Sequence, residues 1–217
     1  MTQNAASETA CGSPPPFAML TISKSRIEAL SDGVFAIAMT LLVLKLEVPE
    51  VMHHSSNEAM LQELLGMTPV FLTYVVTFLI AGGFWFLHQL TFHFIRQVDS
   101  LLVWINLFLL MLVALLPFSA GLMSHLFIHP VSQLFYYGNQ FAIATLLNIH
   151  WHYAKRKALV HGGEPKDMFL LTFRTVQTAV AFAACLLAAV FVPDYSWVPL
   201  PVVFLGGMIV EWFRRNK

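Results

Sequence analysis

Long apolar stretches, separated by short polar or proline-containing breaks, run through most of the chain. An apolar stretch of about 20 residues is long enough to cross the hydrocarbon core of a bilayer as an α-helix. Such stretches predict six transmembrane helices, at approximately residues 26–46, 66–95, 99–125, 132–158, 166–192 and 195–214. Proline and glycine occur at the breaks, where they end helices. The pattern therefore predicts an all-α integral membrane protein with one transmembrane domain over residues 26–217.

The composition supports a membrane protein and argues against other classes. Hydrophobic residues make up 58% of the chain and charged residues 11%, whereas soluble domains carry roughly 25% charged residues. The formal net charge is zero, and no basic stripe offers the electrostatic footprint that a nucleic-acid site needs. Residues 1–25 are polar and contain three consecutive prolines. They lack the pattern of a signal peptide and are predicted to form a disordered cytoplasmic tail.

The positions of lysine and arginine predict the orientation, because cytoplasmic loops retain these residues. If the N-terminus lies inside the cell, ten cations fall at cytoplasmic helix ends: Lys24, Arg26, Arg96, Lys155, Arg156, Lys157, Lys166, Arg214, Arg215 and Lys217. Only Lys45 then falls on the outer side. We therefore expect a multi-pass cell membrane protein with both termini in the cytoplasm.

The first predicted span opens with charged and polar residues, which are costly inside a bilayer unless they face protein or water. Arg26, Ser31 and Asp32 belong to this group. Together they resemble the Arg-x-x-x-Phe-Ser-Asp signature in the first helix of the prokaryotic branch of the endolysosomal potassium channel family, the transmembrane protein 175 family. Leu30 stands where that family has phenylalanine. The resemblance continues into later segments, but only this motif is specific.

The resemblance implies a potassium-permeable cation channel that conducts passively through a homotetramer, with the first helix of each subunit lining a central pore and no carbonyl filter. It implies that Ile37 seals the pore, that Leu41 and Leu44 form further apolar layers, and that Thr40 contacts the ion. These four positions follow the i, i+3, i+4, i+7 spacing of one helical stripe. A narrow apolar ring can gate a pore by excluding water. The alternative is that the stripe packs against neighbouring helices.

Four polar residues from different predicted helices fall at a similar depth, about 9 to 12 Å from the cytoplasmic helix ends at ~1.5 Å per residue. They are Asp32, His88, Asn106 and Arg174. We hypothesise a supporting polar layer in which Asp32 accepts hydrogen bonds from Arg174, His88 or Asn106 and couples the first helix to the rest of the subunit. The alternative is that these groups only satisfy one another and fix helix register.

Other features point to less specific roles. His150 and His152 flank Trp151 and are expected to form an interfacial belt, and Trp85 is expected to anchor a helix end at the membrane interface. No metal-ligand spacing, phosphate loop or nucleophile–base pair is found, so we expect no metal, no cofactor and no enzyme activity. The expected partners are potassium and other monovalent cations, the lipid bilayer and identical subunits. A proton- or cation-coupled secondary transporter remains an alternative, because buried charged residues occur there too.

Overall fold

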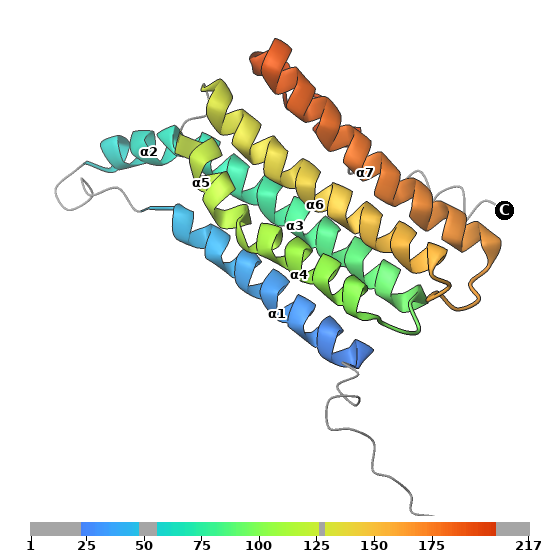
Figure 1. The fold of residues 1–217 in the computed structure, drawn as a ribbon. Helices are drawn as coiled ribbons and strands as arrows, with labels where there is room; N and C mark the ends of the chain where they lie inside the picture. The colour runs from blue at the N-terminus through green and yellow to red at the C-terminus, as the bar shows by residue number, and fades with distance from the viewer. Residues whose placement is uncertain (1–22, 48–55, 126–128, 203–217) are drawn as a thin grey trace, which may run out of the picture.

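The computed structural model describes residues 23–47, 56–125 and 129–202, and its helices lie side by side in an elongated bundle (Figure 1). The elements are α1 (Lys24–Leu42), the 3-10 turn η1 (Val43–Lys45), α2 (Asn57–Gly66), α3 (Thr68–Phe94), α4 (Ser100–Ala114), α5 (Leu116–His125), α6 (Pro130–Arg156), α7 (Pro165–Phe191) and the 3-10 turn η3 (Pro193–Tyr195). In the described ranges the only β-type pairing is an isolated bridge between Ile95 and Val160. The predicted all-helical class is therefore confirmed for this part of the chain.

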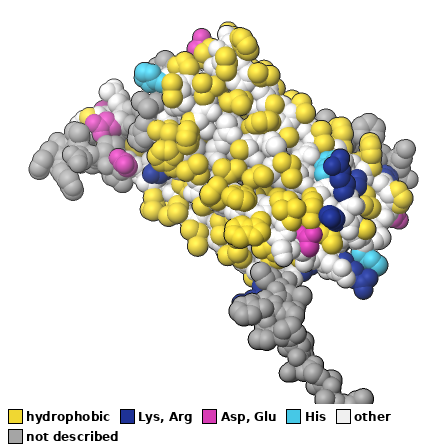
Figure 2. Space-filling model, viewed as in Figure 1, with side chains coloured by type: hydrophobic (Ala, Val, Ile, Leu, Met, Phe, Trp, Pro, Cys, Tyr) yellow, Lys and Arg dark blue, Asp and Glu magenta, His cyan; other side chains and the backbone are white. Residues whose placement is uncertain are grey.

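Four helical stretches are long and apolar enough to cross a membrane: Lys24–Lys45, Thr68–Phe94, Ser100–Ser124 and Pro165–Phe191. A helix of 27 residues, such as α3 or α7, is about 40 Å long, whereas the hydrocarbon core is about 30 Å thick. Hydrophobic side chains cover most of the face seen in Figure 2, and lysine and arginine gather mainly toward one end. A helical bundle that crosses a membrane, with an apolar belt in the bilayer and one cationic end in water, would have this arrangement.

Helix α6 is as long as α3 and α7 but is not among the apolar stretches. Its buried face carries polar side chains, namely Gln133, Tyr136, Tyr137, Asn139, Gln140 and His150. The helix packs against α7 on one side and against α4 and α5 on another, so these groups face protein and not lipid. Polar residues in membrane helices characteristically face the bundle interior, which explains the low hydropathy of this central helix.

The third predicted span, residues 99–125, is divided into two helices at Leu115. Pro117 lies just after the break. Proline has no N–H to donate and its ring clashes with the carbonyl four residues earlier, so a helix breaks or kinks there. The amide of Asn139 on α6 donates to the carbonyl of Leu112, at 3.3 Å, and thereby covers one of the groups near the break.

Two further features, a short helix and the start of α1, differ from the sequence prediction. Helix α2 was not predicted; it begins after Ser56, whose hydroxyl accepts a hydrogen bond from the backbone N–H of Ala59, and none of its side chains is buried. Helix α1 begins at Lys24, so the last residues assigned to the tail are helical. The rest of the predicted tail, residues 1–22, and residues 203–214 of the predicted sixth span lie outside the described residues.

The loops at the cationic end are tied together by backbone hydrogen bonds. The N–H of Arg96 donates to the carbonyl of Leu159 at 2.8 Å, and the N–H of His161 donates to the carbonyl of Phe94 at 2.9 Å. The α3–α4 and α6–α7 connections therefore form one unit, which fixes the relative positions of the helices that carry the polar residues described next.

Candidate pore-lining face and its buried polar network

Helix α1 has one face inside the bundle and one face outside it. The inner face consists of Ile27, Ser31, Phe35, Ala38 and Leu42, which are buried against α3, α4 and α5. The predicted stripe lies on the outer face: Ile37 is 61% exposed, Leu41 41% and Leu44 68%. In the described chain the stripe therefore lies largely outside the subunit's own bundle, as the lining of a shared pore would.

Thr40 lies on the same outer face and is exposed. Its hydroxyl donates to the backbone carbonyl of Ile37 at 2.9 Å. Because the one O–H of threonine is used in this bond, only its oxygen lone pairs remain available. The outward-facing group is thus an acceptor, which is the polarity that a cation requires.

On the inner face, Ser31 begins a chain of buried hydrogen bonds that links three helices. Its hydroxyl donates to the carbonyl of Ile27 at 2.8 Å and accepts from the amide nitrogen of Asn106 on α4 at 3.1 Å. The amide oxygen of Asn106 bonds Nε2 of His88 on α3 at 2.9 Å. Since an amide oxygen only accepts, His88 donates through Nε2. Ser31, His88 and Asn106 are each at most 1% exposed, so this chain joins α1, α3 and α4 in the interior.

Asp32 has partners other than the predicted ones. One of its carboxylate oxygens accepts hydrogen bonds from Nε1 of Trp85, at 2.8 Å, and from Nε2 of Gln89, both on α3. The expected bonds from His88, Asn106 and Arg174 are not formed. The physical reason is direction: Ser31 and Asp32 are adjacent on a helix and point about 100° apart, so Ser31 enters the bundle while Asp32 stays at its exposed edge.

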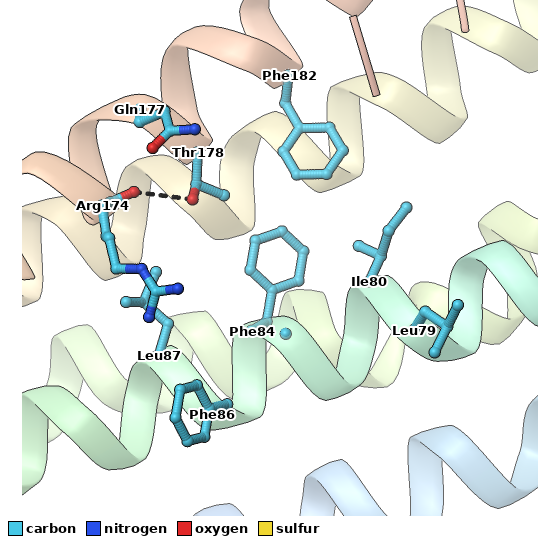
Figure 3. Close-up of a pocket in the computed structure, with 10 residues that line it drawn as sticks. Leu79, Ile80, Phe84, Phe86, Leu87, Arg174, Gln177, Thr178 and Phe182 are labelled. Atoms are coloured by element: carbon cyan, nitrogen blue, oxygen red, sulfur yellow. Dashed lines mark hydrogen bonds between the residues drawn. The ribbon is translucent and has the colours of Figure 1, made fainter. Parts of the chain in front are cut away.

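Arg174 lies apart from this network, on α7. Figure 3 shows its side chain crossing toward α3 and ending beside Leu87. It lines a cavity between α3 and α7 together with Phe84 and Phe182. The predicted four-residue layer therefore divides into a buried pair, His88 with Asn106, an edge carboxylate, Asp32, and a separate guanidinium, Arg174.

Sequence reasoning missed or misplaced three residues around this network. Trp85 was expected to anchor a helix at the membrane interface, but its ring nitrogen bonds Asp32. Gln89 was not singled out, although it follows Trp85 by one helical turn and thus shares its face. His150 was assigned to an interfacial belt, which is wrong because it is fully buried, 5.1 Å from the ring of Phe92 and 6.1 Å from that of His88.

The described residues contain no group of three or more histidine, cysteine, aspartate or glutamate side chains that could hold a metal ion. Together, the long apolar helices, the buried polar network and the unpacked stripe on α1 define a class: a helical, multi-pass membrane protein whose first helix presents a distinctive outer face.

Comparison with known proteins shows which family the chain resembles. Residues 26–117, which cover most of α1 and all of α2, α3 and α4, match the model of the family described as endosomal/lysosomal potassium channel TMEM175. A crystal structure of a lysosomal potassium-selective channel TMEM175 homologue from Chamaesiphon minutus has a similar fold, with a TM-score of 0.70 and 27% identity over 89% of this chain and 98% of that one. The first half of the chain thus resembles the TMEM175 family of ion channels, and the fold as a whole resembles that of a solved TMEM175 homologue.

Two bacterial relatives are each named a potassium channel. The relative from Chamaesiphon minutus is 38% identical over 59% of this chain and 64% of its own length. The relative from Streptomyces collinus is 40% identical over 46% of this chain and 47% of its own length. The chain thus matches about half to two thirds of the length of these curated relatives.

Proposed function

We propose that this protein is a potassium-permeable cation channel that conducts passively through a central pore formed by four identical subunits. The observation that carries the proposal is the stripe of Ile37, Thr40, Leu41 and Leu44, which faces away from its own bundle. A pore on that face requires several copies of the chain around one axis. The match to the family model and the names of the bacterial relatives support potassium as the conducted ion.

In this proposal the apolar stripe is the gate. Four copies of Ile37 would form a narrow ring, with Leu41 and Leu44 as further rings one and two helical turns later. Such rings bind ions poorly and exclude water when narrow, so the pore closes by dewetting and opens by widening. The lone pairs of Thr40 would replace part of the hydration shell of a passing cation, because its O–H is bonded to the backbone.

The polar residues on the other side of α1 would support the gate helix. Ser31 is tied to α4 through Asn106, and Asp32 is tied to α3 through Trp85. Arg26, the first residue of the motif, is exposed at the start of α1, where it would face the pore mouth. These bonds hold α1 at a defined rotation and would couple any rotation of it to α3 and α4.

We further propose that each subunit has six transmembrane helices, with residues 195–214 as the sixth, and that both termini are cytoplasmic. The orientation rests on the exposed cations at the end where α6 meets α7, namely Lys155, Arg156, Lys157 and Lys166, together with Arg96. Cytoplasmic loops carry such an excess of lysine and arginine. A coupled transporter, the other class considered, is favoured neither by the family nor by the names of its relatives.

Planar bilayer recordings of the purified protein test this function. We expect potassium currents with a reversal potential set by the potassium gradient, and a larger open probability for Ile37→Asn, because a polar ring wets more readily than an apolar one. The matched control is Ile149→Asn, which makes the same change at a site on α6 that is 46% exposed. Native mass spectrometry of the same sample is expected to give four subunits.

The outcomes separate the gate from the channel. Equal currents from wild type and Ile37→Asn would refute the gate assignment. Strictly coupled flux without single-channel events would refute the channel itself. Increased leak in Ile149→Asn as large as in Ile37→Asn would show that any polar substitution on the exposed surface disturbs the protein, and would remove the support for a pore on the α1 face.

A further inference from the structure

Arg174 is a positively charged residue inside a membrane-spanning helix and outside the network that holds α1. It is half-buried in a cavity of about 180 Å³ between α3 and α7. The walls contributed by α3 are aliphatic and aromatic, and the α7 side adds Gln177, Thr178 and Phe182. Figure 3 shows the guanidinium reaching across this cavity toward α3.

No negative charge meets this guanidinium in the part of the chain that the structure describes. The one ion pair found there joins Lys24 and Glu28 on α1. No hydrogen bond joins the guanidinium to its polar neighbours in the described residues: the hydroxyl of Thr178 donates to the Arg174 carbonyl at 2.8 Å, and the amide nitrogen of Gln177 donates to the carbonyl of Val202 at 2.8 Å. A guanidinium in an apolar groove is costly unless an anion or water reaches it.

The depth of Arg174 indicates which anion can reach it. Helix α7 has 27 residues and is about 40 Å long, so about 5 Å at each end would extend beyond a hydrocarbon core of about 30 Å. Arg174 follows the first residue of α7 by nine positions, which puts its Cα about 8 Å below the edge of that core. Long cationic side chains at this depth extend toward the headgroups.

We propose that the groove between α3 and α7 binds an anionic phospholipid, with its phosphate on Arg174. Guanidinium N–H groups match two phosphate oxygens in a bidentate contact. The acyl chain would lie along the apolar wall, where Phe84 and Phe182 are in ring contact at 5.6 Å. A lipid satisfies both the charge and the apolar walls, whereas a free phosphate ion satisfies only the charge.

The test measures lipid binding to the delipidated full-length protein in uncharged detergent by native mass spectrometry. We expect phosphatidylglycerol to bind about fivefold more tightly than phosphatidylcholine, as one cation–headgroup attraction near a membrane surface provides. Arg174→Gln should remove this preference and Arg174→Lys should retain part of it. The matched control is Lys166→Gln, an exposed cation at the start of the same helix, which should retain the preference.

Three results would overturn the proposal. The first is equal binding of the two lipids to the wild type, which decides the matter even if Arg174→Gln fails to fold. The second is a loss of preference in Lys166→Gln as large as in Arg174→Gln, which would indicate diffuse attraction to the cationic end. The third is a rise in melting temperature with inorganic phosphate alone that equals the rise with phosphatidylglycerol. That result would indicate a free anion as the ligand, or a site that needs no acyl chain.

Discussion

Replacing Asn106 with alanine tests whether the buried network holds α1 in place. Asn106 is 1% exposed and joins Ser31 to His88. After the substitution Ser31 keeps its bond to the Ile27 carbonyl, but the Nε2–H of His88 loses its acceptor inside the protein. A buried donor without a partner costs about 1–3 kcal/mol, whereas interhelical hydrogen bonds measured in membrane proteins average about 0.6 kcal/mol. We expect a loss of about 2 kcal/mol in the free energy of unfolding.

Reversible unfolding in mixed micelles, followed by circular dichroism, measures this loss. The matched control is Asn148→Ala, because Asn148 on α6 is half-buried and its side chain makes no hydrogen bond within the described residues. A double-mutant cycle with Ser31→Ala should give a coupling of about 0.6 kcal/mol between Ser31 and Asn106. If Asn106→Ala costs no more than Asn148→Ala, or if the coupling is zero, the network does not contribute to holding the helix.

Two further substitutions test other parts of the structure. A Cβ added at Gly163 would lie 2.5 Å from Cε1 of Phe94, whereas one added at Gly162 would meet nothing within 4 Å; in thermal unfolding we therefore expect Gly163→Ala to be less stable than Gly162→Ala by about 1 kcal/mol or more. Trp85→Phe removes one of the hydrogen bonds to Asp32, and we expect a loss of about 1 kcal/mol in the micelle assay.

The control for the tryptophan substitution is Trp104→Phe. Trp104 is 59% exposed on α4, and its ring nitrogen makes no hydrogen bond in the described part of the chain. If the two substitutions lower the free energy of unfolding equally, the hydrogen bond to Asp32 contributes no stability beyond that of the indole ring's buried area. Equal stability of the two glycine variants would likewise show that the ring of Phe94 moves aside without cost.

The sequence by itself determined the helical membrane class and the approximate positions of most long helices. Hydrophobicity over about 20 residues is a local property, so it needs no knowledge of the fold. Helical periodicity also places Ile37, Thr40, Leu41 and Leu44 on one stripe. The least accurate predictions concern α6, whose polar residues become explicable only once its neighbours are known, and the unforeseen α2.

Only the tertiary structure decided which face of α1 is inside the subunit and which partners its polar residues have. Counting residues along helices gives a depth but no direction around the axis, so Asp32 and Arg174 could share a depth without touching. Adjacent residues on a helix point about 100° apart, which is why Ser31 joins the buried Asn106 and Asp32 reaches Trp85 at the edge. The direction of each side chain depends on how the helices are rotated against one another, and that rotation is set by packing between segments far apart in the chain.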